Sequence, residues 1–146
     1  MNQSGRVNPV TLLAVVAIVL FAFVLLFSRE GVSTVGARFM GALARHDVDT
    51  LTKMTYLGEG ISDEEIRKKW DFAVNEAGKH YRFAWKVTGT TQTTENEAAV
   101  RLQVVRNMES GAAYEENFQL PLVKRNGEWK VFVRGINREM FPALPR

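Results

Sequence analysis

LVKRNGEWKVFV, residues 122–133, sets an Asn-Gly pair between two runs in which apolar and polar side chains alternate. Alternation with a period of two is typical of a strand with one buried face. Asn126-Gly127 favours the two-residue type I′ turn, which needs positive φ at both positions and joins antiparallel strands. The stretch therefore predicts a β-hairpin.

The same period continues upstream of this hairpin. The apolar series are Tyr81, Phe83, Trp85 and Val87; Val100, Leu102 and Val104; Phe118, Leu120 and Leu122; and Trp129, Val131 and Val133. The first two series are separated by a short polar turn at Glu95-Asn96, and strands that are joined by short turns pair antiparallel. We expect a four-stranded antiparallel meander with one apolar face.

Before residue 80 the apolar period is helical. Ser33 is the expected N-cap of a first helix, and His46-Asp47 is its expected end. Apolar residues follow at a spacing of three or four: Val35, Phe39, Met40 and Leu43. Asp49 is then expected to cap a short helical turn that carries Leu51 and Met54.

A second helix is marked more clearly by ISDEEIRKKWDFAVNEAGK, residues 61–79. Ser62 and Glu65 have the spacing of a capping box, and Ile61 and Ile66 that of a hydrophobic staple. Gly78 is the expected C-terminal stop. The predicted apolar stripe is Ile66, Trp70, Ala73 and Ala77. Apolar helix faces over a one-faced sheet indicate an α+β domain.

Residues 10–27 contain no charged residue, amide or glycine. At about 1.5 Å per residue a helix of this length is roughly 27 Å long, close to the ~30 Å hydrocarbon core of a bilayer. Asn8-Pro9 provides a helix start. We expect a single transmembrane anchor in a lipid bilayer, with the anchor residues Val10, Leu13, Ile18, Phe21, Leu25 and Phe27. The alternative is a cleaved secretory signal, although residues 27–30 lack the small residues of a cleavage site.

The charges that flank residues 10–27 help to predict on which side of the membrane the C-terminal domain lies. Arg29, Arg38 and Arg45 follow the apolar stretch, whereas only Arg6 precedes it. The positive-inside rule would place the C-terminal part in the cytoplasm, yet a long domain translocates largely regardless of charge. We favour a signal anchor with the domain on the extracytoplasmic (periplasmic) side. The expected organisation is a tail at 1–9, the anchor at 10–27, the domain at 28–134 and a C-terminal tail at 135–146.

Composition excludes several kinds of chemistry. The 146 residues include no cysteine, so disulfides, cysteine metal sites and thiol catalysis are excluded. The net charge of +3 is too mild to indicate nucleic acid as a partner. His46 and His80 have no partner at metal-ligand spacing. We therefore expect no metal and no cofactor.

ARFMGALARHDVDTLTKM (37–54), the second helix and the terminal hairpin together resemble the nuclear-transport-factor-2-like (NTF2-like), or cystatin-like, superfamily. The likeness covers roughly residues 33–134 and is greatest to bacterial membrane-anchored or lipoprotein members of unassigned function. The resemblance implies a cone-like domain in which a curved four-stranded antiparallel sheet wraps around two to three helices. It does not fix a function.

Members of the superfamily that are isomerases or cyclases carry a carboxylate inside the cone. The matching region here offers only Glu59, between two glycines, which is a poor match, so no catalytic residue is predicted. The aromatic side chains of the sheet either line a pocket or form the core; they are Tyr81, Phe83, Trp85, Phe118 and Trp129.

Two surfaces are candidates for contacts with a partner. The opposite sheet face carries a basic series that is either simply solvated or binds anionic lipid or an acidic protein: Arg82, Lys86, Arg101, Lys130 and Arg134. In the tail, Met140 and Phe141 either cover the core of this domain or contact a partner.

Two classes of function follow from these features. The first is a non-catalytic, membrane-tethered protein-interaction module, an accessory or assembly subunit of a larger membrane complex. Resembling domains play such parts in type IV secretion channels and in mammalian-cell-entry transporter assemblies. The alternative is a small-molecule binder or a cyclase/isomerase-like enzyme that uses the cone.

Overall fold

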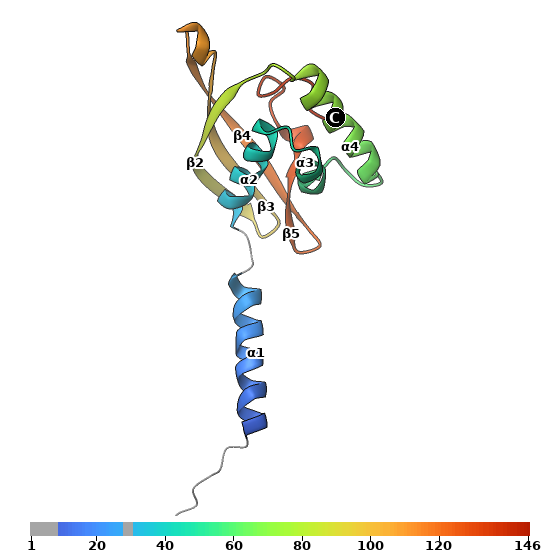
Figure 1. Ribbon diagram of the computed structural model, residues 1–146, viewed down its shortest axis with the longest axis vertical. Coiled ribbons are helices and arrows are strands. Elements are labelled where there is room, and N and C mark those ends of the chain that lie inside the picture. The colour runs from blue at the N-terminus through green and yellow to red at the C-terminus, as the bar shows by residue number, and fades with distance from the viewer. Residues whose placement is uncertain (1–8, 28–30) are drawn as a thin grey trace, which may run out of the picture. The chain divides into compact units, whose positions relative to one another are not determined.

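A computed structural model describes residues 9–27 and 31–146 of the chain. The chain forms two compact units, Met1–Glu30 and Gly31–Arg146. The first contains the helix α1, Pro9–Phe27 (Figure 1). Its large apolar side chains, where they are described, are 49–72% exposed, among them the predicted anchor residues Val10, Leu13 and Ile18. The side chains of Phe21, Leu25 and Phe27 lie outside the described part of the structure.

Among the described residues no helix combines the length and the apolar character that crossing a bilayer requires. The transmembrane anchor, and with it the side of the membrane, stays a prediction.

The second unit is an α+β domain, as predicted. The strands that the structure describes form one sheet, in the order β1-β5-β4-β3-β2. Their bounds are β1 Thr55–Tyr56, β2 Phe83–Thr94, β3 Glu97–Arg106, β4 Tyr114–Arg125 and β5 Glu128–Phe132. The sheet is curved, and α2, α3 and α4 lie on one face of it (Figure 1).

The four predicted strands pair antiparallel in the predicted order. Asn126 and Gly127 have φ of 51° and 78°, as a type I′ turn requires. The sheet nevertheless has five strands in its described part, because β1 pairs parallel with β5 and makes the sheet mixed. Two residues are too few to show an alternating pattern, so the sequence carries no signal for β1.

The helices of the domain are α2 Val32–Ala44, α3 Val48–Met54 and α4 Asp63–Asp71, which continues as the π-helical η1 Phe72–Ala77. The capping role of Ser62 is confirmed, since its hydroxyl accepts from the Glu65 N–H at 3.2 Å. The other two predicted caps are wrong. Gly31, with no side-chain bond, precedes α2, and Asp47 rather than Asp49 caps α3.

The π-helical turn η1 also corrects the predicted apolar stripe. Ile66, Trp70 and Ala73 are buried as expected, but Ala77 is exposed and Val74 is buried in its place. A π turn, with i→i+5 hydrogen bonds, holds more residues than an α turn and breaks the 3–4 spacing. Gly78 ends the helix, as predicted.

The core extends beyond the last predicted strand. After the 3-10 turn η3, Val133–Gly135, four apolar side chains of the C-terminal segment are buried: Ile136, Met140, Phe141 and Leu144. The compact unit that contains the sheet extends to Arg146, so residues 135–146 pack with the domain.

Alanine substitution at two glycines of α2 is expected to have opposite effects on stability. A Cβ at Gly36 would lie 2.8 Å and 2.9 Å from the two γ-methyls of Val100, which is fully buried on β3. Overpacking costs about 1–3 kcal/mol, more than the ~1 kcal/mol that alanine gains in helix propensity. Gly36→Ala should lower the free energy of unfolding in urea.

Gly41→Ala is the matched control, because the nearest atom to its Cβ is Arg45 Nη1 at 3.1 Å, at the end of a flexible side chain. This variant should gain about 0.5–1 kcal/mol. A Gly36→Ala protein as stable as Gly41→Ala would contradict the close helix–sheet approach.

Removal of the Asp47 cap is expected to cost stability in a pH-dependent way. Asp47 accepts from the Thr50 hydroxyl at 2.7 Å and the Thr50 N–H at 3.1 Å, and these bonds lower the pKa of its carboxyl. A lowered folded pKa gives stability that is present above the unfolded pKa and is lost as the pH falls through the folded pKa. Asp47→Ala should cost about 0.5–2 kcal/mol at neutral pH and progressively less in acid. Asp47→Asn keeps the acceptor without titrating, so its stability relative to Asp47→Ala should be nearly independent of pH.

Candidate functional site

Two opposite charges lie on the core-facing side of the sheet, at the end of β3 and the start of β4. On β3, Arg106 continues the inward series of Val100, Leu102 and Val104. On β4, Glu116 lies directly opposite Val104, which places it on the same face. Arg106 and Glu116 are thus diagonal neighbours across two strands, a separation that long side chains can bridge.

Arg106 is at the centre of a closely packed group. Its Nη2 lies 2.8 Å from Glu116 Oε2, and the two side chains are only 12% and 31% exposed. The guanidinium carbon lies 5.3 Å from the ring centre of Phe118 and 5.6 Å from that of Tyr81, within cation–π range. Nη2 also donates to the main-chain carbonyl of Glu139. We call these four side chains, Tyr81, Arg106, Glu116 and Phe118, the Arg106 cluster.

Tyr81 connects this cluster to the C-terminal segment. Its hydroxyl donates to the carbonyl of Met140 at 3.2 Å, and its ring meets Phe141 edge-on at 5.2 Å. Burial raises the pKa of the Tyr81 phenol, and the nearby Arg106 charge partly offsets this. Tyr81 is therefore neutral at neutral pH, and the C-terminal segment covers this end of the inward face.

Two polar atoms of the Arg106 cluster have no hydrogen-bond partner among the residues that the structure describes. Arg106 Nε and Glu116 Oε2 are buried and have no hydrogen-bond partner there, so the 2.8 Å contact is an ion pair without hydrogen-bond geometry. Through Oε2 the Glu116 carboxylate is paired with Arg106, while its side chain remains 31% exposed. The cluster can hold charge and position a polar group.

The predicted aromatic residues of the sheet belong to the core. Phe118 is buried, and the partly buried members packed against the core are Tyr81, Phe83, Trp85 and Trp129. Tyr81 and Phe118 also contact Arg106, which the sequence did not indicate. Of the two readings that the sequence left open, the core reading describes their packing.

The five predicted basic residues are spread over several strands and their ends. Lys86 and Arg101 are near neighbours, because Lys86 pairs with Gln103 and Arg101 with Gly89. Lys130 faces Val123, two strands away from β3, and donates to the Lys53 carbonyl. Arg82 donates to the Lys79 carbonyl, and Arg134 lies near Gly58.

The remaining predicted residues do not assemble into a site. Met140 and Phe141 are 2% and 1% exposed, so the tail covers this domain's own core and these two side chains are not a partner surface. Burial and the Arg82 charge lower the pKa of His46. Glu59 accepts from the Tyr56 hydroxyl at 3.0 Å. Within residues 9–27 and 31–146, no group of three His, Cys, Asp or Glu side chains could hold a metal ion.

Sequence reasoning missed Arg106 and Glu116 as members of a site. The signal in the sequence is their position. Arg106 comes two residues after Val104 and Glu116 two residues before Phe118, so each falls at the next inward-facing position of its strand, and their charges are opposite. A charged residue at the end of a strand is usually solvated. Only the register that sets Val104 opposite Glu116 brings the two together.

The Arg106–Glu116 pair is expected to show measurable coupling in a double-mutant cycle. Single and double variants of Arg106→Met and Glu116→Gln would be unfolded in urea, and the interaction energy taken from the four stabilities. Breaking a buried pair costs about 3–5 kcal/mol and an exposed pair ~0–1 kcal/mol. Because Glu116 is partly exposed, we expect about 1–2 kcal/mol, between those limits.

The ion pair between Lys68 and Glu64 is the control, because its 2.9 Å contact is as short but the side chains are 76% and 77% exposed. The same cycle there should give about 0.3–0.5 kcal/mol and should be screened by salt. Equal coupling in the two pairs would show that the Arg106 cluster is solvated like any surface.

Comparison with known proteins bears on the fold. The sequence matches no protein-family model and no curated protein. A protein described as a calcium/calmodulin-dependent protein kinase type II association domain, from Thiobacillus denitrificans, is 9% identical with a TM-score of 0.51, over 70% of this chain and 90% of that one. A ketosteroid isomerase-like protein from Erwinia carotovora atroseptica is 18% identical (TM-score 0.46; 66% and 85% covered). An NTF-2-like protein of unknown function from Shewanella oneidensis is 12% identical (TM-score 0.43; 66% and 88% covered).

Two of the similar structures, that of Shewanella oneidensis and one from Campylobacter jejuni (18% identical; TM-score 0.43; 66% and 93% covered), are described as NTF2-like. At these identities the likeness concerns the fold alone.

Proposed function

We propose that this chain is a non-catalytic, membrane-tethered module with an NTF2-like fold, which acts by binding a protein partner as an accessory or assembly subunit of a membrane complex. The tether is residues 10–27, and the domain is on the extracytoplasmic side. Holding a domain near a membrane complex raises its effective concentration towards partners there, even when each contact is weak.

The observation that carries the proposal is the closure of the inward sheet face at the Arg106 cluster. Glu116 is paired with Arg106, and Tyr81 bonds to the C-terminal segment that covers this end. General-base chemistry needs a carboxylate within reach of the substrate proton. A carboxylate that is already paired with an arginine favours a structural role over a catalytic one.

The tether is supported by the apolar character of α1. Its described apolar side chains are mostly exposed, and leaving such surface in water is unfavourable by about 25 cal/mol per Å². Lipid or a partner helix would cover it. The uncharged sequence of residues 10–27 favours lipid.

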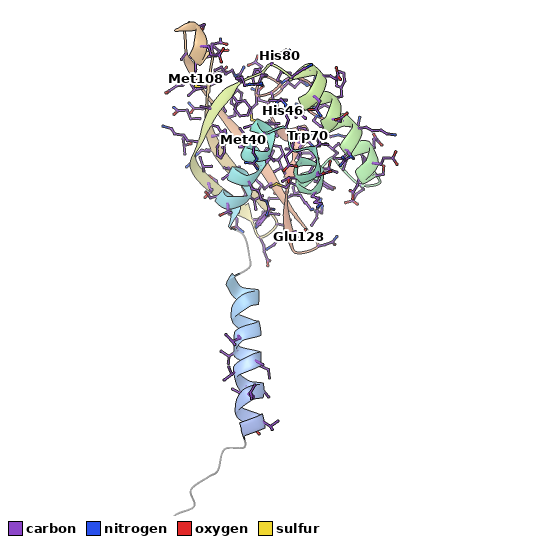
Figure 2. All side chains as sticks on the ribbon, in the orientation of Figure 1. Met40, His46, Trp70, His80, Met108 and Glu128 are labelled. Carbon is purple, nitrogen blue, oxygen red and sulfur yellow. The ribbon has the colours of Figure 1, made fainter. Side chains whose placement is uncertain are left out.

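Exposed apolar side chains on the domain support a partner role. Met108, 49% exposed, lies in the 3-10 turn η2 (Met108–Ser110) between β3 and β4, and Tyr114, 45% exposed, begins β4. Figure 2 shows Met108 at the end of this hairpin, away from Trp70 in the core. Aromatic and methionine side chains are enriched at protein interfaces.

The test uses the full chain in its native membranes. We expect intact protein in the membrane fraction after a carbonate wash, and extraction in mild detergent should give a particle larger than the monomer with co-purifying proteins. Protease added to spheroplasts should digest the domain. A monomer in detergent without other proteins would contradict the assembly role, and intact protein in the detergent-free soluble fraction would contradict the tether.

A second candidate, a small-molecule binder or an isomerase-like enzyme, is favoured by one observation. Arg106 Nε and Glu116 Oε2 are buried without hydrogen-bond partners among the described residues, and a polar ligand could satisfy them. Exchange of the α-protons of a β,γ-unsaturated ketone for deuterium, followed by NMR, tests this. Exchange that is catalysed by the chain and lost in Glu116→Gln would establish the enzyme and refute the non-catalytic role.

A further inference from the structure

An open pocket of about 250 Å³ lies in the C-terminal segment, apart from the Arg106 cluster. Its lining residues are Arg138, Ala143, Leu144 and Arg146. Ala143 has a φ of 51°, in the left-handed region that non-glycine residues rarely adopt, so the chain turns sharply here. The turn brings arginines eight positions apart in sequence to one pocket.

The guanidinium of Arg146 is held in place from behind. Nη1 donates to the Arg134 carbonyl and Nη2 to the Ile136 carbonyl, the latter at 2.9 Å. A guanidinium has five N–H donors, so others remain for a ligand. Because the main chain already fixes this group, binding a ligand would cost little side-chain entropy.

Arg138 supplies a second positive charge to the pocket. It is exposed and forms no ion pair with any residue that the structure describes. Burial, and to a lesser extent the Arg138 charge, lower the pKa of Arg146, in keeping with the two guanidinium groups lining one pocket. An anion between them would interact favourably with both charges.

We propose that this pocket binds a phosphate group, with Arg138 and Arg146 donating to its oxygens and Leu144 forming an apolar wall. A tetrahedral oxyanion has enough acceptor oxygens to bond two guanidinium groups at once, and arginine suits such multidentate contacts. The pocket is smaller than the ~300–1,000 Å³ of sites for drug-sized ligands. It therefore suits a head group or a small phosphate ester.

The phosphate could belong to a soluble ester or to a lipid head group. The inference uses only contacts among residues 134–146, so it does not depend on the tether or on a protein partner. Its test can be done in detergent micelles, where neither a bilayer nor a partner is present.

The experiment follows the arginine Nε–Hε signals by NMR, in the full chain in zwitterionic micelles. Inorganic phosphate is titrated first, and short-chain phosphatidylglycerol second, with phosphatidylcholine as the lipid blank. We expect a saturable shift of the Arg138 and Arg146 signals. Saturation by inorganic phosphate assigns a soluble ester, and saturation by phosphatidylglycerol alone assigns a lipid head group.

Two variants make the result decisive. Arg138→Gln leaves the bonds of Arg146 to the main chain intact, and it should weaken binding about tenfold, as expected for the loss of a charge-assisted contact. Arg101→Gln removes an exposed arginine of the sheet whose side chain bonds only weakly to Thr91, at 3.3 Å, and should leave binding unchanged. No saturable shift with either probe, or equal binding by wild type and Arg138→Gln, would overturn the proposal.

Discussion

Trp70→Ala is expected to lower the free energy of unfolding by about 3–5 kcal/mol. Trp70 is fully buried on α4, with Phe39 of α2 edge-on at 5.8 Å. Its indole N–H donates to the Thr55 hydroxyl at 2.8 Å, which connects α4 to β1. The substitution removes the largest buried side chain and leaves a cavity where two helices and the sheet edge meet. Urea unfolding followed by far-UV circular dichroism measures the loss.

Phe72→Ala is the matched control, two residues along the same helix. Phe72 is 57% exposed, so truncating its ring should change stability by no more than about 0.5 kcal/mol. Trp70→Phe should fall between the two, because it keeps most of the volume and loses the bond to Thr55. A Trp70→Ala protein as stable as Phe72→Ala would show that α4 is not packed as described.

The sequence predicted those features whose chemistry is local. The hairpin at Asn126-Gly127 and the cap at Ser62 each involve residues no more than three positions apart, and both are present in the structure. The alternation of the strands likewise predicted four strands and their antiparallel pairing. Local propensity and tertiary structure agree at these positions.

Features that depend on register or on tertiary contact were not predictable in this way. Arg106 and Glu116 meet only because β3 and β4 pair with Val104 opposite Glu116. β1 is a strand only because Thr55 and Tyr56 lie beside β5. The π turn η1 moves Ala77 out to solvent, although the 3–4 spacing of the sequence predicted that it would be buried.

The C-terminal segment shows the same limit. Pro142 and Pro145 exclude a regular helix or strand, so no period marks which of its side chains are buried. Its place is set instead by distant contacts, among them the bond from Tyr81 to the Met140 carbonyl. From the sequence, Met140 and Phe141 could equally cover the core of this domain or contact a partner.

Phe141→Ala is expected to cost about 3–5 kcal/mol, which would make the C-terminal segment as important to stability as the helices. Phe141 is 1% exposed and meets Tyr81 at 5.2 Å and Phe83 at 6.1 Å, both nearly edge-on. Its ring also occupies the space beside Gly78, where an added Cβ would lie 2.5 Å from Phe141 Cζ. A side chain that fits so closely against a strand and the end of a helix cannot be truncated without leaving a cavity.

Hydrogen exchange in the same variant distinguishes loss of the segment from loss of the whole fold. If the segment unfolds alone, the Met140 amide, which bonds to the Asn137 carbonyl at 3.1 Å, should lose protection while the amides of β3 keep theirs. If the segment is part of one cooperative core, both should lose protection together, and this is the result we expect because Tyr81 and Phe83 pack on Phe141 from the sheet side. Met108→Ala, which truncates an apolar side chain that is 49% exposed, should leave both sets of amides unchanged. Unchanged protection at residue 140 in Phe141→Ala would mean that the ring does not hold the segment in place. The segment would then be held to the Arg106 cluster by the bonds from Tyr81 to the Met140 carbonyl and from Arg106 to the Glu139 carbonyl.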